Sequence, residues 1–229
     1  MEKEQAIAAV VQNSLLGAKM SEADIREFLS SGQVNVADYP KGGIVFHDGD
    51  MPQYLYVLLA GKVHIQKESF TGRHIFLSEI DEPGDVFGEV YLLMGRPYDM
   101  YVEAVKPTRL LQVSNKAFSL QPEKVSAPVM QVQRNLMQIL ARKAYFMHTK
   151  LKVLASGTLR EKIARFIFWG MDSEGKLQLD YTRETWASYF SVARPSLSRE
   201  LSAMQQEGII NVTGRNVQVT DREAFEAYL

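Results

Sequence analysis

Between residues 34 and 113 the sequence is interrupted about every ten residues by glycine, proline or aspartate, and this spacing restricts the possible folds more than any other feature. The segments in between are short and rich in β-branched and aromatic residues, as in Tyr54–Ala60. Short apolar segments between regular turn signals are typical of sandwiches and barrel-like sheets. We predict a jelly-roll-like β-roll here, with turns at Gly42-Gly43, Asp48-Gly49-Asp50, Gly61, Thr71-Gly72, Pro83-Gly84-Asp85 and Gly95. Ser21 and Asp24 form a predicted capping box for a helix that precedes the roll.

Residues 124–155 predict one long helix with two apolar faces. The first face has alternating spacings of three and four residues, which is typical of a coiled-coil seam: Met130, Gln133 (the one polar position), Met137, Leu140, Ala144, Met147, Leu151 and Leu154. The second face is expected to pack on the sheet: Val129, Val132, Leu136, Ile139 and Phe146. The pattern favours a dimerisation helix, and the alternative is a core helix within one chain.

The C-terminal part predicts a winged helix-turn-helix. Thr158 with Glu161, and Thr182, are N-cap signals for two helices. The next helix begins at Arg194, with Pro195 in its first turn. The core of the motif has the expected spacing: Ala187, Val192, Leu197 and Leu201. A strand over residues 176–180 and a hairpin over residues 209–219 complete the wing.

The second helix of such a motif enters the major groove with its N-terminal residues. Here the groove-facing candidates are Arg194, Ser196, Ser198 and Arg199. Arginine can pair with guanine through two hydrogen bonds, and serine can bond a base edge or a phosphate. We expect Arg183 and Arg215 to contact phosphates. The alternative is a winged helix that binds protein.

The net charge of −1 gives no sign of a nucleic-acid partner, but its distribution does. Residues 1–123 carry 11 basic and 17 acidic side chains, residues 124–152 carry six basic and no acidic ones, and residues 153–229 carry nine and ten. No apolar segment approaches the roughly 20 residues of a membrane helix, and no signal peptide is recognised. We therefore expect a cytoplasmic protein with no membrane partner.

Taken together, the chain resembles the CRP/FNR family of bacterial transcription regulators over essentially its whole length. The winged helix is similar to that family's DNA-binding domain. The β-roll is similar to a cyclic-nucleotide-binding-type sensor domain through Pro40-Lys41-Gly42, Ile44, Phe46, Gly49-Asp50, Leu55-Tyr56, Gly61, Pro83-Gly84-Asp85 and Phe87-Gly88-Glu89.

The resemblance implies an α+β chain in three parts: a sensor β-roll over residues 1–123, a dimerisation helix over 124–155 and a winged helix-turn-helix over 156–229. It further implies a homodimer, double-stranded DNA as partner, RNA polymerase as partner of an activator, and a small effector between the roll and the central helix. It implies no enzymatic activity.

Two positions depart from the members that bind cyclic AMP. Those members place an Arg-Ser pair for the cyclic phosphate after the Gly-Glu that is Gly88-Glu89 here, whereas this chain has Tyr98 and Asp99. An aspartate beside a phosphate would repel it, so we expect an effector other than cyclic AMP. Arg96 could substitute for the missing arginine, so a cyclic nucleotide stays open as an alternative. The absence of cysteine excludes the iron–sulfur sensors of the family.

An aromatic effector pocket is the expected replacement. Its candidates are Gly88, Glu89, Tyr91, Tyr98, Tyr101, Gln138 and His148. Such a lining suits an apolar or aromatic ligand or a haem, whose axial ligand would be histidine or methionine, so the cofactor stays open. A metal-dependent cupin-like enzyme is the alternative from another class. It needs closely paired histidines, which His47, His64 and His74 do not provide, so we predict no metal site.

The helix-turn-helix also departs from the family. Many members have a glutamate directly after the first arginine of the second helix, where this chain has Pro195. Proline has no side-chain acceptor, so the DNA half-site is expected to differ from theirs. Ser191 stands where the turn often has glycine, and some strain is expected there.

Overall fold

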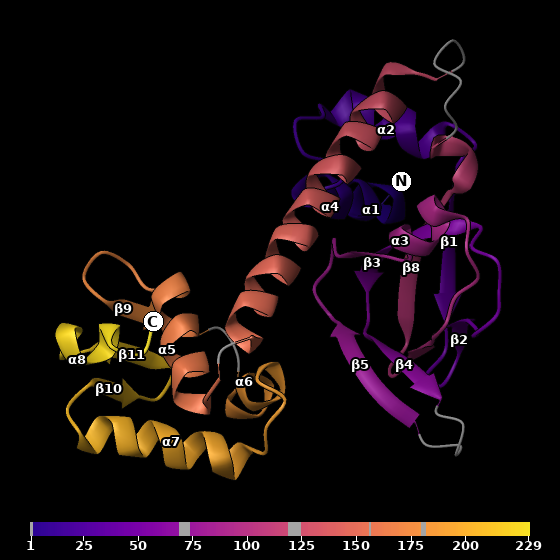
Figure 1. Cartoon of the computed structure of the whole chain (residues 1–229). Helices are drawn as coiled ribbons and strands as arrows, with labels where there is room; N and C mark the ends of the chain where they lie inside the picture. Colours follow the sequence, from indigo (N-terminus) through magenta and orange to yellow (C-terminus); the bar gives the residue numbers. More distant parts are fainter. Residues whose placement is uncertain (1, 69–73, 119–124, 156, 180–181) are drawn as a thin grey trace. The chain divides into compact units, whose positions relative to one another are not determined.

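The computed structural model describes residues 2–68, 74–118, 125–155, 157–179 and 182–229 (Figure 1). The chain forms two compact units, Met1–Ala141 and Arg142–Leu229. The dividing point lies inside the long helix α4 (Ala127–Leu154), because residues of this helix belong to the hydrophobic cores of both units. The domain boundaries after residues 123 and 155 stay predictions. Ser156, the first residue of the predicted winged helix-turn-helix part, lies outside the described residues.

The first unit consists of two helices, a β-roll and the first half of α4. Its other elements are α1 (Glu2–Asn13), α2 (Glu22–Ser30), β1 (Val34–Tyr39), β2 (Ile44–Phe46), β3 (Tyr54–Ala60), β4 (Val63–Glu68), β5 (His74–Ile80), β6 (Val86–Phe87), α3 (Glu89–Met94), β7 (Tyr101–Ala104), β8 (Thr108–Ser114) and the 3-10 helix η1 (Asn115–Phe118). The capping box of Ser21 and Asp24 opens α2 as predicted.

The strands form two antiparallel four-stranded sheets, in the orders β1-β8-β3-β6 and β2-β7-β4-β5. The predicted α+β fold with an N-terminal β-roll is therefore confirmed. Strand β3 is buried from Leu55 to Leu59, and Val57 lies opposite Leu111 of β8. A strand buried on both faces must be apolar throughout, which is why this segment lacks the alternation typical of a surface strand.

Helices α1, α2 and α4 pack around one sheet. One hydrophobic core joins Val11 of α1 and Phe28 of α2 to Val57 and Leu111 of the sheet. Four α4 side chains complete it, as predicted for the second apolar face: Val129, Val132, Leu136 and Ile139. The prediction for Phe146 was wrong. Its side chain is 57% exposed, and its ring lies edge-on to Tyr189 in the second unit, because this part of α4 belongs to the other core.

Asn135 fastens the connection between α1 and α2 to α4. Its amide nitrogen donates to the carbonyl oxygens of Leu16 at 2.7 Å and Ala18 at 2.8 Å, and its side-chain oxygen accepts from Gln131 at 3.0 Å. The side chain is 1% exposed. A buried amide with all these partners fixes one arrangement of the packed helices, because every alternative leaves polar groups unpaired.

The second unit is a helical core with a small sheet. Its elements are α5 (Leu159–Gly170), β9 (Lys176–Gln178), α6 (Arg183–Tyr189), α7 (Arg194–Gln206), β10 (Ile210–Thr213), β11 (Asn216–Val219) and α8 (Arg222–Glu226). The predicted N-caps Thr158 and Thr182 are both formed. The wing is the sheet β10-β11-β9. Strand β9 ends at Gln178, and Asp180 lies outside the described residues.

Arg160 connects three elements of this unit. Its guanidinium bonds Glu200 of α7 at 2.6 Å, Glu207 at 2.6 Å and 2.8 Å, and the Tyr228 hydroxyl at 3.2 Å. The carboxylates, with Glu207 first, hold the pKa of Arg160 well above its usual value. Because both acids flank the C-terminal half of α7, this cluster fixes α7 against α5.

We expect Arg160→Met to lower the Tm of the second unit by roughly 5 °C, since two carboxylates and a tyrosine lose a shared, partly buried cation. Thermal unfolding followed by circular dichroism measures this. Arg222→Met is the matched control, because the pair that Arg222 makes with Glu226 is exposed, and this variant should shift the Tm by less than about 2 °C. Equal shifts in the two variants would contradict the role given to Arg160.

Candidate DNA interface and effector site

Helices α6 and α7 meet through a tight turn. The amide of Val192 donates to the carbonyl of Ala187 at 3.0 Å, and Val192 itself packs against the core of the unit. Ser191 has a φ of 57°, the left-handed region that disfavours any side chain. The strain expected at this position is therefore present. Trp186 of α6 and Phe190 at its C-cap are fully buried, and their burial fixes the orientation of α6.

One face of α7 is buried and the other is open. Leu197, Leu201 and Met204 lie in the core. The predicted groove-facing residues all lie in the first two turns: Arg194 and Arg199 are exposed, and Ser196 and Ser198 are partly exposed. Their grouping follows from helical periodicity, since these positions avoid the buried stripe.

Polar neighbours orient the two arginines of α7. Arg194 pairs with Glu184 of α6 at 3.0 Å, and Arg199 lies 3.5 Å from the Ser196 hydroxyl. Sequence reasoning missed Glu184. Acid and base lie ten residues apart on different helices, so only the turn brings them together. Pro195 costs little in the first turn, where the backbone amide has no partner within the helix.

The two predicted phosphate contacts differ in surroundings. Arg183 is partly buried with its guanidinium over the Trp186 ring, 5.9 Å from the centroid, and burial followed by the nearby Arg194 lowers its pKa. Arg215 is exposed in the two-residue loop between β10 and β11. Arg183 and Arg194 thus form one basic group, whereas Arg215 lies at the tip of the wing.

The predicted effector residues of the first unit start at the beginning of α3. Gly88 has a φ of 80°, and a Cβ there would lie 3.1 Å from the Tyr56 ring and 3.4 Å from the Tyr98 hydroxyl oxygen. Glycine is therefore required for both conformation and space. Glu89 follows with its side chain buried.

Tyr98 fills part of the roll interior with its own ring. It is 3% exposed and stacks on Phe46 with a centroid distance of 3.7 Å and an angle of 10°. Backbone hydrogen bonds with Gly49 and Asp50 hold it in place, at 2.8 Å and 3.0 Å. Its buried hydroxyl has no hydrogen-bond partner among the described residues. Burial raises the pKa of Tyr98, so the phenol stays neutral.

Asp99 points away from the roll interior into an ion pair. Its carboxylate bonds Lys67 of β4 at 2.8 Å and accepts from the Tyr91 hydroxyl. Lys67, followed by Tyr91, lowers the pKa of Asp99, and burial together with Asp99 raises the pKa of Tyr91 to about 12. Arg96, the possible replacement for the missing arginine, is exposed.

The structure therefore brings together Gly88, Glu89, Tyr91 and Tyr98. Sequence reasoning missed Phe46, Tyr56 and Phe87, which lie in the same core as Tyr98. The other three candidates lie elsewhere. Tyr101 bonds the Nδ1 atom of His74 at 2.6 Å, and Gln138 and His148 are exposed on α4. His148 belongs to the second unit.

Two further observations bear on the predicted partners. Among the described residues there is no group of three or more histidine, aspartate or glutamate side chains placed to hold a metal ion. Within the same residues, no helix is long and apolar enough to cross a membrane.

Comparison with known proteins agrees with this architecture. The family described as "Cyclic nucleotide-binding domain" matches residues 36–120, and "Crp-like helix-turn-helix domain" matches residues 161–228. The chain is 26% identical to the cyclic AMP receptor protein of Thermus thermophilus, over 82% of this chain and 85% of that protein. It is 25% identical to a CRP-like cAMP-activated global transcriptional regulator of Mycobacterium tuberculosis, over 83% and 86%.

The fold agrees as well. The crystal structure of the Thermus thermophilus catabolite activator protein covers 94% of this chain and 98% of its own, at 24% identity and a TM-score of 0.53. A sensor roll followed by a helix-turn-helix defines a transcription regulator with an effector-binding domain and a DNA-binding domain. The chain belongs to the CRP/FNR family of these regulators, and its relatives are regulators rather than enzymes.

Replacing Ser191 by glycine should stabilise the second unit by about 0.5–1 kcal/mol, because glycine adopts the left-handed conformation without steric cost. Urea unfolding measures the change. The control is Ser188→Gly in the exposed, right-handed α6 helix, which should destabilise by up to about 1 kcal/mol. Loss of stability in Ser191→Gly would show that the serine side chain compensates for the strain.

Proposed function

We propose that this protein is a homodimeric, sequence-specific DNA-binding regulator whose first unit binds a small effector other than cyclic AMP. The observation that carries the proposal is the open face of α7, which presents arginine and serine where a protein-binding face would present apolar side chains. A regulator of this kind works where its DNA is, so we place it in the cytoplasm. Contact with RNA polymerase would follow if it is an activator.

Arg194 and Arg199 are suited to guanine, and Ser196 and Ser198 to base edges or phosphates. Arg183 and Arg215 supply positive charge from α6 and from the wing, which supports binding to the backbone on either side of the groove. Pro195 removes the acceptor that many relatives place at this position. The DNA half-site is therefore expected to differ from theirs at one base pair.

Exposed apolar side chains on α4 support the dimer. Met137, Met147 and Leu151 are 63%, 53% and 62% exposed, and they lie on the predicted seam of three- and four-residue spacings. A row of large apolar side chains in water is unfavourable, and a second copy of the same helix would cover it.

The expected exclusion of cyclic AMP rests on Tyr98 and Asp99. The similar proteins named above are described as a cyclic AMP receptor and a cAMP-activated regulator. Here a buried tyrosine ring replaces the arginine, and the aspartate is committed to Lys67 and Tyr91. Nothing remains at these two positions to neutralise a phosphate. No observation favours haem, since His148 is exposed and belongs to the second unit, so haem is not part of the proposal.

Arg199→Ala should weaken binding to a specific promoter fragment by about 1–3 kcal/mol, or roughly 5- to 150-fold, because a bidentate contact to a base is lost. Fluorescence anisotropy at fixed salt measures this. Arg109→Ala removes the same charge from β8 of the first unit and serves as the control. Unchanged affinity in Arg199→Ala would contradict the assignment of α7 as the helix that reads the bases.

For a dimer, the bound promoter fragment should contain two inverted half-sites about 10 base pairs apart, and a fragment with a single half-site should bind more weakly.

Cyclic AMP at 1 mM should leave the Tm and the DNA affinity of the protein unchanged, because Tyr98 and Asp99 stand where the arginine and serine for the cyclic phosphate would be. The double variant Tyr98→Arg with Asp99→Ser restores the two groups that a cyclic phosphate needs and should gain measurable binding. Isothermal titration calorimetry compares the two proteins. Tight binding of cyclic AMP to the unaltered chain would overturn the proposed effector class.

A further inference from the structure

An acidic side chain lies within the basic face that α6 and α7 form. The carboxylate of Glu184, in the first turn of α6, accepts a hydrogen bond from Nη1 of Arg194, in the first turn of α7, at 3.0 Å. The other arginine predicted to face the groove, Arg199, lies beside the Ser196 hydroxyl instead. The two arginines of α7 therefore differ chemically, because one has a counter-charge and the other has a neutral neighbour.

The fold, rather than the local sequence, brings this acid and base together. Burial of Trp186 fixes α6, and burial of Leu197 fixes α7. The turn between the two helices is closed by the hydrogen bond from the Val192 amide to the Ala187 carbonyl at 3.0 Å. Two rigid elements thus hold the carboxylate and the guanidinium within reach of each other.

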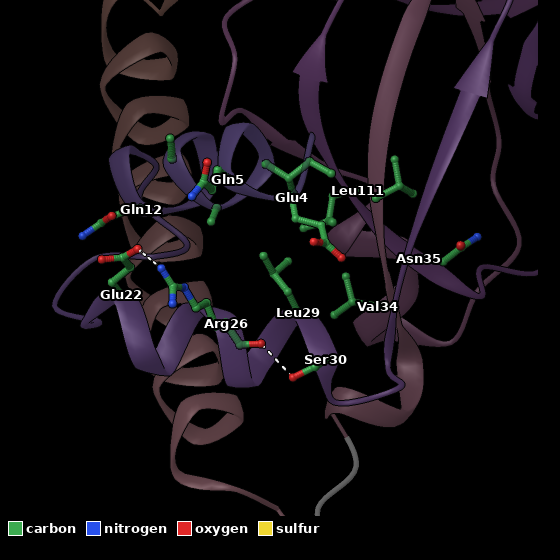
Figure 2. A pocket seen from close by; sticks show the side chains of 14 residues that line it. Glu4, Gln5, Gln12, Glu22, Arg26, Leu29, Ser30, Val34, Asn35 and Leu111 are labelled. Carbon is green, nitrogen blue, oxygen red and sulfur yellow. Dashed lines mark hydrogen bonds and ion pairs between the residues drawn. The ribbon is translucent and has the colours of Figure 1, made fainter. Parts of the chain in front are cut away.

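The pair is too exposed for its main effect to be on folding. The side chains of Arg194 and Glu184 are 60% and 64% exposed. Figure 2 shows a pair of nearly the same exposure, that of Arg26 with Glu22, which lies within α2. Exposed pairs of this kind contribute little to stability, because water screens them and ordering two long side chains costs entropy. The effect of Glu184 is therefore expected in the surface that it shares with Arg194.

The surroundings of Arg194 favour a carboxylate beside it. Arg194 lies at the positive end of the α7 dipole, and the first turn of α7 contains no acidic residue. Arg183 is also near, since burial followed by Arg194 lowers the pKa of Arg183. Both effects are unfavourable for a guanidinium, and Glu184 offsets them from the neighbouring helix.

The pairing leaves Arg194 the donors that a base needs. The guanidinium has five N–H groups, and Glu184 takes one of them at Nη1, whereas Nε and Nη2 make no hydrogen bond among the described residues. These two atoms form one fork for the O6 and N7 atoms of guanine. A phosphate attracts an arginine mainly through charge, which Glu184 already neutralises, whereas the acceptors of guanine are uncharged. The pair therefore weakens attraction to a phosphate more than attraction to a guanine edge.

We propose that Glu184 is a positioning residue for sequence recognition: it holds the Arg194 guanidinium with one fork free for a guanine and keeps it from pairing with the phosphate backbone. Its carboxylate lowers the affinity for DNA of any sequence and increases the difference between the correct site and other DNA. This inference rests on the proposed function, because it assigns a role within the DNA-binding face of α7.

The experiment uses Glu184→Gln, which keeps the size of the side chain and removes its charge. The probes are a duplex that the unaltered protein selects from a random-sequence library and a mixed-sequence duplex of the same length, and fluorescence anisotropy on the full chain measures binding. The variant should bind the mixed-sequence duplex more tightly. Its plot of log K against log salt should be steeper by about 0.9, because Arg194 is free to neutralise one more phosphate. The ratio of the affinities for the two duplexes should fall by about fivefold or more.

Glu22→Gln is the matched control, because it removes the same charge from a similarly exposed arginine pair on α2. It should leave both the salt dependence and the affinity ratio unchanged. In an Arg194→Ala background, Glu184→Gln should also leave the ratio unchanged, since no guanidinium remains to be positioned. Selection with Glu184→Gln and with Arg194→Ala should lose base preference at the same position of each half-site.

Two results would overturn the inference: an affinity ratio that stays constant in Glu184→Gln, or a ratio that falls equally when Arg194 is absent. The second result would mean that the carboxylate acts without Arg194. Failure of the unaltered protein to select any duplex, or unchanged binding of the selected duplex in Arg199→Ala, would instead contradict the proposed DNA-binding function. The two failures are therefore seen separately.

Discussion

The packing of α4 against the sheet through Val129, Val132, Leu136 and Ile139 is the constraint on which the first unit depends. These side chains close a core that includes both N-terminal helices, and Asn135 on the same helix adds a satisfied, buried polar contact. Burial of four large apolar side chains contributes several kcal/mol, and the amide makes one helix arrangement specific. Further along, Val153 of α4 is buried in the second core. One continuous helix thus supplies side chains to both units.

The predictions that succeeded came from sequence patterns that report burial or that depend on neighbouring residues alone. The turn spacing predicted the roll, and the spacing of apolar residues predicted the buried face of α4, because both patterns report burial directly. Phe146 continued the same pattern but lies beyond the point where the helix leaves the first unit, and no periodicity marks that point. The caps at Ser21, Thr158 and Thr182 were predictable because a cap depends on neighbouring residues alone.

Contacts between distant residues could not be predicted. Arg160 lies 40 residues from Glu200 and 47 from Glu207, and Asn135 lies 119 from Leu16. Within the proposed effector site, the substitution of Tyr98 and Asp99 was visible in the sequence. The stacking on Phe46 and the pair with Lys67 were not, because they depend on how strands from separate hairpins meet. Tyr101 was grouped with Tyr91 by proximity in sequence, yet its hydroxyl bonds His74 on β5.

Tyr98 has a consequence for where an effector can bind. A side chain that is 3% exposed and stacked at 3.7 Å already supplies the apolar contacts that a ligand in this part of the roll would make. Binding there would require displacement of the ring, and its loss of packing would reduce the net affinity.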